Sequence, residues 1–220
     1  STDKEKREKY VKYLYEKLQR DGQLERDVDR LVRNDRIAWG ASMIACNDAD
    51  AMVTGNIRHY AASIEKLKKV VDPRPGEEIF GMTMMVSKGK TIFVADTNVK
   101  DFPSAERLAK VSISCVRVAR LFGFDPKVAF LSHSTFGKPV SKNTKHVRDA
   151  IDLLKKQKVD FEFDGEMQPD VALNPIYQEV YPFSKIVGNA NILMMPALHS
   201  AAISTKLMKS FGGAKLIGPL

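Results

Sequence analysis

The sequence predicts an α/β protein of three layers, with helices on both faces of a mostly parallel sheet. Short apolar runs alternate with longer segments whose apolar residues recur at helical spacing, which is typical of crossover connections between parallel strands. One pair of apolar runs is joined by a short glycine-containing turn, which indicates an antiparallel hairpin attached to the sheet. With 220 residues and 44% hydrophobic side chains, the chain can bury a substantial core.

The first seventy residues or so are predicted to be mainly helical. Helices are expected at residues 3–20, 28–32, 37–46 and 58–71. A brief apolar run, Ala51-Met52-Val53-Thr54-Gly55, predicts a strand between the third and fourth of them. Asp72-Pro73-Arg74-Pro75-Gly76 predicts a turn, because two prolines prevent a helix from continuing.

Strands and helices alternate in the rest of the chain. The predicted order is a hairpin of strands at residues 80–86 and 91–95, a helix at 103–122, a strand at 127–131, a helix at 141–156, a strand at 161–163, a short helix at 175–181, a strand at 190–196, a helix at 200–210 and a strand at 214–217. The strand, helix and strand between residues 127 and 163 form a crossover unit.

Two polar loops are predicted to follow the strands of this crossover unit. Ser132-His133-Ser134-Thr135-Phe136-Gly137 comes after the first strand, and Asp164-Gly165-Glu166-Met167-Gln168-Pro169-Asp170 after the second. Ligands of open α/β sheets bind in the crevice beyond the carboxyl ends of the strands. We therefore expect both loops to face one cleft.

The residue types in these loops leave alternatives open. The hydroxyls, backbone N–H groups and glycine of residues 132–137 suit a phosphate or another anion, but an ordinary capped turn would have the same composition. His133 stands between two serines without the sharp turn of a nucleophile elbow, so a structural or ligand-contacting histidine is predicted. Asp164, Glu166 and Asp170 suit a divalent metal, acid–base chemistry or a helix cap.

Charge and composition narrow the classes of partner. The net charge of +8 and pI of about 9.4 are compatible with nucleic acid or with a polyanionic small ligand. The cations are interleaved with acids along helices, without a basic block joined to stacking aromatics, so we expect no nucleic-acid partner. No apolar run is long enough to span a membrane and no signal peptide is recognised, which predicts a cytoplasmic protein without a membrane partner. Cys46 and Cys115 are expected to be buried free thiols.

An ordered series of motifs resembles the phosphate acetyl/butyryltransferase family. The motifs are Asp48-Ala-Asp-Ala-Met-Val-Thr-Gly55, Phe93-Val-Ala-Asp-Thr97, Pro126-Lys-Val-Ala-Phe-Leu-Ser-His-Ser-Thr-Phe-Gly137, Asp164-Gly-Glu-Met-Gln-Pro-Asp-Val-Ala-Leu173 and Gly188-Asn-Ala-Asn-Ile-Leu-Met-Met-Pro196. More narrowly, the chain resembles the C-terminal phosphotransacetylase-like domain of the large bacterial NADP-dependent malic enzymes.

This resemblance implies a two-lobed architecture, similar to that of isocitrate and isopropylmalate dehydrogenases. Residues 1–125 and 212–220 would form a first lobe, residues 126–211 a second, and the first lobe would be incomplete. The whole of residues 1–220 would then be one fragment of a phosphotransacetylase-like domain within a longer polypeptide.

The resemblance also implies a function. The domain would be an acetyl-CoA-responsive regulatory and homo-oligomerisation module, and the malic-enzyme part of the same polypeptide would use NADP and Mg²⁺ or Mn²⁺ to convert malate to pyruvate and CO2. We expect no catalytic or metal-binding residue in this segment. Acetyl-CoA or phosphate would be bound by Arg58, Ser132, His133, Ser134, Thr135, Gly137, Asp164 and Glu166.

Two alternatives remain beside this interpretation. Arg58 could form an ordinary salt bridge, and the resemblance is what favours a ligand role for it. The chain could also be an active phosphate acetyltransferase. Against this, Arg58-His59-Tyr60 stands where active members have a His-Thr stretch, and Phe136 stands where they commonly have a lysine or a small residue.

Overall fold

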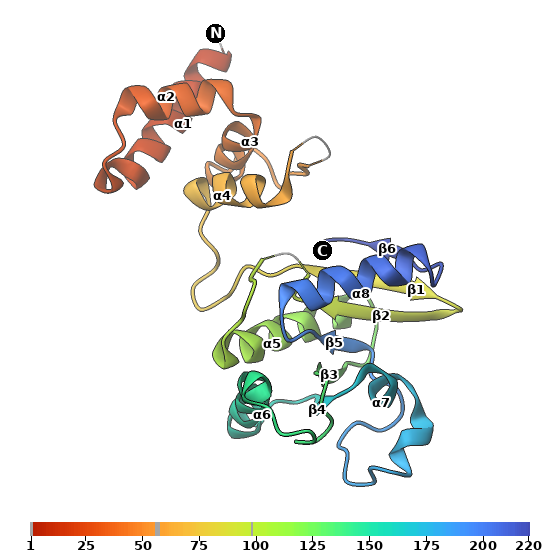
Figure 1. The fold of residues 1–220 in the computed structure, drawn as a ribbon. Helices are drawn as coiled ribbons and strands as arrows, with labels where there is room; N and C mark the ends of the chain where they lie inside the picture. Colours follow the sequence, from red (N-terminus) through yellow and green to blue (C-terminus); the bar gives the residue numbers. More distant parts are fainter. Residues whose placement is uncertain (1, 56–57, 98) are drawn as a thin grey trace. The chain divides into compact units, whose positions relative to one another are not determined.

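The computed structural model describes residues 2–55, 58–97 and 99–220 (Figure 1). The chain divides into two compact units, Ser1–Arg74 and Pro75–Leu220. The division falls within the proline-rich turn predicted at residues 72–76, which joins the last helix of unit 1 to the first strand of unit 2.

The described residues of unit 1 form four α-helices, as the apolar spacing predicted. They are α1 (Thr2–Leu18), α2 (Glu25–Asn34), α3 (Arg36–Ala45) and α4 (Tyr60–Val70), with a 3-10 turn at Gln19–Asp21. Their inward faces form one core, in which the rings of Tyr10 and Trp39 meet edge to face with their centroids 5.1 Å apart. The hydroxyl of Tyr10 donates to Asp48, and burial together with this contact raises the pKa of Tyr10 to about 12.

The strand predicted at residues 51–55 is wrong. These residues have no regular structure, and Val53 is fully exposed. A strand needs a neighbouring strand to bond its N–H and C=O groups, and the described part of unit 1 contains only helices and loops.

Unit 2 contains one six-stranded sheet in the order β4-β3-β5-β2-β1-β6. The strands are β1 (Met82–Ser87), β2 (Lys90–Ala95), β3 (Lys127–Leu131), β4 (Glu162–Met167), β5 (Ile192–Met194) and β6 (Lys215–Ile217). Strands β2, β5, β3 and β4 are parallel, while β1 is antiparallel to both β2 and β6. The predicted mostly parallel sheet with an attached hairpin is confirmed.

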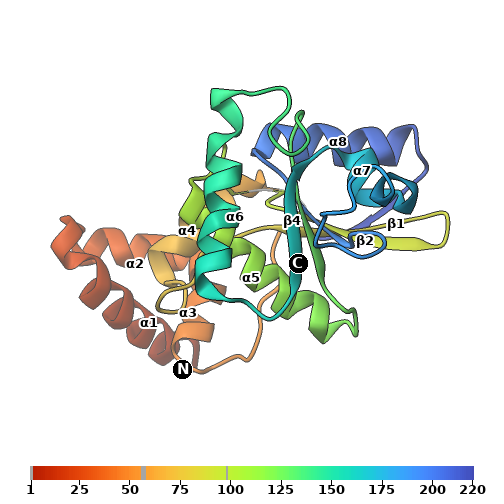
Figure 2. The same cartoon turned by 90° about the horizontal axis from the view of Figure 1, so that it is seen from below.

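Helices cover both faces of this sheet, which confirms the three-layer prediction (Figures 1 and 2). On one face, α5 (Ala105–Leu121) and α6 (Lys145–Gln157) pack on the strands, and on the other face α7 (Pro169–Leu173) and α8 (Leu198–Ser210) do so. Short 3-10 helices lie at Lys142–Thr144 and Pro175–Gln178. Among the described helices, none is long and apolar enough to cross a membrane.

Two details of α5 agree with its sequence. The side chain of Ser104 accepts from the N–H of Arg107 and caps the helix, as expected for a serine at this position. Cys115 is fully buried in the core beneath α5, and this burial raises the pKa of its thiol. Cys46 is also a free thiol, but it is partly exposed rather than buried.

The structure divides the chain at a different place from the predicted lobes. Residues 1–125 and 212–220 were expected to separate from residues 126–211. Instead, Phe93 on β2 pairs with Ile192 on β5, so strands from both sides of residue 125 belong to one sheet. A boundary at that point would break a hydrogen-bonded ladder.

Residues 164–167 are part of β4 and not of a loop, which corrects a second expectation. The strand runs to Met167, which pairs with Leu131 after a register shift in β3. The polar residues of Phe163-Asp164-Gly165-Glu166 are typical of a loop, yet Asp164 and Glu166 are both buried. A strand can bury such groups only when each has hydrogen-bond partners.

Candidate functional site

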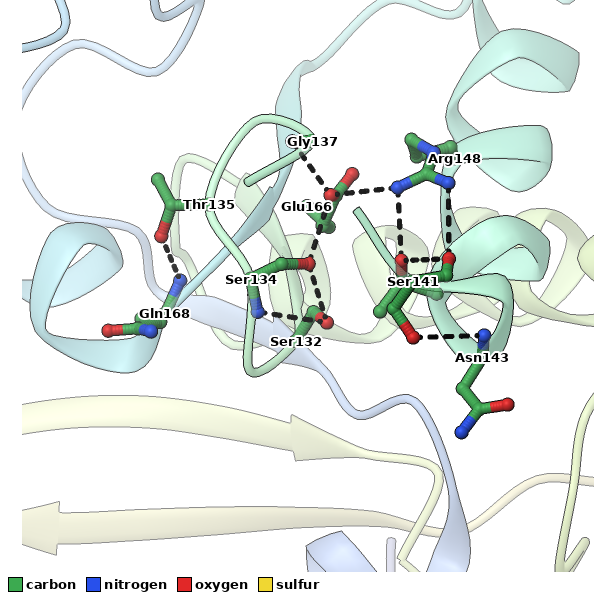
Figure 3. Close-up of polar contacts among 10 residues, drawn as sticks. Ser132, Ser134, Thr135, Gly137, Ser141, Asn143, Arg148, Glu166 and Gln168 are labelled. Carbon is green, nitrogen blue, oxygen red and sulfur yellow. Dashed lines mark hydrogen bonds and ion pairs between the residues drawn. The ribbon is translucent and has the colours of Figure 1, made fainter. Parts of the chain in front are cut away.

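The serine-rich segment after β3 bends back over the end of β4 (Figure 3). Ser132 and Ser134 are buried, whereas His133 between them is exposed. The chain bends at His133 and Ser134 directly after β3, which turns both serine side chains inward and leaves the histidine outside. The Oγ atoms of the two serines lie 3.2 Å apart, on the inner side of the turn.

Glu166 is the centre of this turn. Its side chain is only 1% exposed, and its Oε1 atom accepts from Ser134 Oγ at 3.0 Å, from Gly137 N at 2.9 Å and from Arg148 Nη1 at 3.2 Å. Arg148 also donates to Thr144 Oγ1, which joins the start of α6 to β4. A charged acceptor with three donors holds the turn in one conformation.

The backbone of the turn is consequently less open to an anion than its composition suggested. The N–H groups of five residues already have acceptors within the protein: Ser132, Ser134, Thr135, Phe136 and Gly137. Glu166 alone takes two of these N–H groups, one with its carbonyl and one with its carboxylate. In this conformation, a phosphate would have to displace internal hydrogen bonds in order to use them.

Asp164 has a separate role from Glu166. Its Oδ1 accepts from the N–H of Gly165 and its Oδ2 from the N–H of Lys185, at 2.9 Å and 2.8 Å. It therefore fastens the segment around residue 185 to β4. The helix cap that was one alternative for Asp164 or Asp170 does not form, because Gln168 occupies the cap position without a side-chain cap bond.

A cleft of about 820 Å³ opens at the carboxyl ends of the parallel strands. Its lining includes Phe102 and Pro103 after β2, Ser132 and His133 after β3, Pro196 and Ala197 after β5, and the first residues of α6 and α8. The chain leaves β3 toward α6 on one face and β5 toward α8 on the other. Such a switch between neighbouring strands is where open α/β sheets bind ligands.

Of the predicted ligand residues, Ser132 and His133 line this cleft. Thr135 lines a smaller hollow of about 440 Å³ on the other side of the turn, beside Phe136 and Tyr181. Four predicted residues of unit 2 line neither hollow: Ser134, Gly137, Asp164 and Glu166. Ser134 and Gly137 donate to Glu166, whereas Asp164 accepts from the N–H groups of Gly165 and Lys185.

Two further histidines line the cleft, and the sequence assigned them no role. His146 is the second residue of α6, and its Nε2 lies 3.1 Å from the carbonyl oxygen of Pro196. His199 is the second residue of α8, with its ring 5.5 Å from that of Phe102. The signal that could have found them is that each starts a helix directly after a loop leaving the strand ends.

Arg58 lies in unit 1 and is paired with Asp35. The distance from Arg58 Nη1 to Asp35 Oδ2 is 2.7 Å, and Lys66 also contacts Oδ2. Asp35 caps α3 by accepting from the N–H groups of Ile37 and Ala38. Burial alone would raise the pKa of Asp35, but hydrogen bonds from Lys66, Arg58 and the backbone of α3 outweigh it and hold that pKa well below its usual range.

This ion pair is the ordinary alternative weighed for Arg58. The guanidinium side chain is nevertheless 40% exposed, and it lines a hollow of about 630 Å³ together with Arg36 and Met52. Its ligand role stays a prediction.

The described residues contain no group of three or more His, Cys, Asp or Glu side chains that could hold a metal ion. Asp164 and Glu166 were considered as metal ligands, but they do not form a metal-binding group, because different backbone and side-chain donors bind each carboxylate.

Together, a mostly parallel sheet, helices on both faces and a crevice at the switch between strands define a three-layer α/β domain. The profile described as "Phosphate acetyl/butaryl transferase" matches residues 1–220, and the chain belongs to this family. The membership predicted from the motifs is thereby confirmed.

Relatives of two kinds match the chain. The NADP-dependent malic enzyme of Rhizobium meliloti is 46% identical over 211 residues, which cover 96% of this chain and 28% of that enzyme. The chain thus spans just over a quarter of the length of this relative. The phosphate acetyltransferase of Clostridium acetobutylicum is 30% identical over 225 residues, or 98% of this chain and 67% of that protein.

A solved structure has the same fold. A phosphotransacetylase from Streptococcus pyogenes superimposes with a TM-score of 0.87 at 28% identity, covering 96% of this chain and 66% of the other. The chain is therefore a phosphotransacetylase-like domain of the kind found in NADP-dependent malic enzymes.

Proposed function

We propose that this domain is an acetyl-CoA-responsive regulatory and oligomerisation module of an NADP-dependent malic enzyme. The full-length protein would oxidatively decarboxylate malate to pyruvate and CO2 in the cytoplasm, using NADP and Mg²⁺ or Mn²⁺ bound outside this segment. The observation that carries the proposal is the 46% identity to a malic enzyme of which this chain spans only 28%. A domain of that size accompanies the oxidoreductase part without replacing it.

The cleft at the strand ends supports acetyl-CoA as the effector. Its volume of about 820 Å³ lies in the range of small-molecule pockets. Lys142 and Lys145 on one side, and three histidines around the rest, give it side chains that can attract phosphate groups. Effector binding would change malic-enzyme activity through a coupling free energy between two sites.

The turn around Glu166 supports the absence of transacetylase activity. Its buried carboxylate is engaged by three donors and lines no cavity. Phe136, which stands where active members commonly have a lysine or a small residue, turns its ring onto Tyr181 and Phe183, with centroids 5.3 Å and 4.8 Å away. Ser134 and Glu166 thus contact each other within the turn, and neither lines the cleft.

The first test is malate-dependent NADP reduction by the full-length polypeptide, with and without acetyl-CoA. Lys142→Glu reverses a charge at the cleft, and Lys90→Glu makes the same change on an exposed lysine at the opposite end of β2. We expect acetyl-CoA to change the rate in the wild type and in Lys90→Glu, with a weaker response in Lys142→Glu. A rate that acetyl-CoA leaves unchanged in the wild type would contradict the regulatory proposal.

The second candidate is an active phosphate acetyltransferase, which the 30% identity to the Clostridium acetobutylicum enzyme favours. The full-length polypeptide would then form acetyl-CoA and phosphate from acetyl phosphate and coenzyme A. Loss of this turnover on Ser132→Ala, at the end of β3, would place the reaction in the cleft. An absence of turnover in the wild type would leave the regulatory proposal alone.

Self-association is part of the leading proposal, and α8 is the surface on which to test it. Ile203, Leu207 and Phe211 recur every fourth residue and are 65%, 61% and 92% exposed. Large apolar side chains in such a row are typical of protein interfaces. If a second copy covers this row, Leu207→Glu will reduce the molar mass measured by light scattering. An unchanged mass would remove α8 from the interface.

A further inference from the structure

The hollow of about 440 Å³ on the other side of the turn after β3 has aromatic walls. Three segments of unit 2 line it: the turn itself, the start of α7 and the loop around the 3-10 helix Pro175–Gln178. They bring together the rings of Phe136, Tyr177, Tyr181 and Phe183. A hollow of this size, with mostly apolar walls and a few polar groups, is typical of a small-molecule site.

The backbone of the turn fixes the position of Phe136. Thr135 and Lys138 exchange two backbone hydrogen bonds, of 2.9 Å and 3.1 Å, around it. Phe136 itself has a positive φ of 47°, which is unusual for a bulky side chain, and strain of this kind occurs at ligand sites. Its ring centroid is thereby held 5.3 Å from that of Tyr181 and 4.8 Å from that of Phe183.

This ring cluster is open to solvent and not buried in the core. Phe183 is largely exposed, and so is Val180, which also lines the hollow. The rings of Tyr181 and Phe183 meet edge to face, with their centroids 6.0 Å apart. A further aromatic ring would gain the same kind of contact and would cover apolar surface that now faces water. The hollow is therefore suited to a ligand that has an aromatic ring.

Two opposite charges also line the hollow. Lys138 closes the turn, and Asp170 lies at the start of α7. Both residues are exposed, and neither takes part in an ion pair within the described part of the chain. Each can therefore pair with a ligand group of opposite charge without breaking an internal contact. A carboxylate suits Lys138, and an ammonium group suits Asp170 and the neighbouring tyrosine rings.

We propose that this hollow binds a free α-amino acid with an aromatic side chain. The side chain packs against Phe136 and Phe183, the carboxylate pairs with Lys138 and the ammonium group pairs with Asp170. A ligand with a single charge would use only one of the two protein charges, so charge complementarity favours a zwitterion. The site is separate from the cleft and does not depend on the proposed function.

Isothermal titration calorimetry of the full-length polypeptide with L-phenylalanine and L-tryptophan tests the site. A ligand of this size should bind with a Kd of about 10 μM to about 1 mM. Three analogues each lack one recognised group: N-acetyl-L-phenylalanine lacks the ammonium, L-phenylalanine amide lacks the carboxylate, and L-alanine lacks the ring. The first two should bind about three- to tenfold more weakly than phenylalanine, and alanine more weakly still.

Two variants test which side chain binds each charge of the ligand. Asp170→Asn should weaken the binding of phenylalanine about three- to tenfold but leave that of N-acetyl-L-phenylalanine unchanged, because this analogue has no ammonium group. Lys138→Gln should likewise weaken phenylalanine but not its amide. Asp125→Asn and Lys90→Gln make the same changes at exposed residues outside the hollow and should bind like the wild type.

Two further variants test the aromatic wall. Phe183→Ala removes an exposed ring and should weaken the binding of phenylalanine about tenfold, whereas Leu121→Ala, at an exposed position outside the hollow, should have no effect. Phe136→Lys introduces the residue that active members commonly have there and should abolish binding. Far-UV circular dichroism checks the folding of each variant. If Phe136→Lys does not fold, Phe183→Ala decides the question.

Three outcomes would refute the site. The first is an absence of binding by phenylalanine and tryptophan up to about 10 mM. If, in addition, Phe183→Ala lowers the molar mass measured by light scattering, a second copy of the chain occupies the hollow instead. The second is equal affinity for phenylalanine and its analogues. The third is binding that Asp170→Asn, Lys138→Gln and Phe183→Ala all leave unchanged, which would place the amino acid elsewhere. Since acetyl-CoA enters none of these measurements, the proposed function stands or falls separately.

Discussion

Replacing Glu166 by glutamine should destabilise unit 2 far more than the same change elsewhere on its strand. The glutamine keeps the shape of the side chain and its acceptor oxygen, but it removes the charge that Ser134, Gly137 and Arg148 share. A hydrogen bond to a charged group contributes about 1.5 to 3 kcal/mol, against about 0.5 to 1.5 for a neutral pair. Allowing for the partial exposure of Arg148, we expect a loss of about 2 to 3 kcal/mol.

Glu162→Gln is the matched control, because it makes the same change on the same strand at a more exposed position. The Glu162 side chain is 39% exposed, and its ion pair with Lys127 spans 3.6 Å. Surface ion pairs contribute about 0 to 1 kcal/mol, so this variant should lose less than about 1 kcal/mol. Glu166→Ala, which leaves three donors without their acceptor, should lose about 3 to 5 kcal/mol.

Urea unfolding measured by far-UV circular dichroism gives these free energies. The single tryptophan lies in unit 1, so its fluorescence identifies the transition of that unit and assigns the other transition to unit 2. Equal losses in Glu166→Gln and Glu162→Gln would refute the conclusion that a buried, charged acceptor holds the turn after β3.

Three further predictions concern stability. Asp35→Asn should lower the free energy of unfolding of unit 1 by about 1 to 3 kcal/mol near pH 7. Because the folded-state pKa of Asp35 is depressed, this difference from the wild type should shrink as the pH falls below about 4. Tryptophan fluorescence in urea measures both effects. Gly165→Ala should destabilise unit 2 by more than about 2 kcal/mol, since its Cβ would lie 2.5 Å from a backbone oxygen of β3. In Gly123→Ala the Cβ enters open space, so this control should lose only about 1 to 2 kcal/mol, because of its positive φ. Equal losses in the two variants would contradict the close contact at Gly165. Leu154→Ala in the core under α6 should lower the urea stability by about 2 to 5 kcal/mol, while Leu121→Ala, at an exposed position, should change it by less than about 0.5; similar values would show that the core is not where the structure places it.

Local patterns in the sequence were sufficient for most of the fold. The hairpin, the four helices of unit 1 and the alternation of strands and helices in unit 2 were all predicted, because each depends on residues close together in the chain. The strand at residues 51–55 failed for a related reason. An apolar run predicts a strand only when another strand is available to pair with it, and that depends on tertiary structure.

The candidate site was predicted less completely than the fold. Ser132 and His133 were placed at a cleft from their position after a buried strand, and both line it. Glu166 was predicted to be a ligand residue, but its polar neighbours are typical of a loop, so the sequence did not indicate that it lies on a strand. Its partners come from residues up to 32 positions away, so no local pattern could show that it is an internal acceptor.

The sequence by itself determined most of the secondary structure, the family and the loop that meets the cleft, because propensity, periodicity and motif order act over short distances along the chain. Only the tertiary structure decided which distant side chains meet. The order of the strands brings His146 and His199 to the edge where His133 lies, and the packing of α3 against α4 gives Arg58 its partner Asp35. Contacts of this kind depend on how elements pair and cross over, which is set by burial of the whole core and not by any one segment.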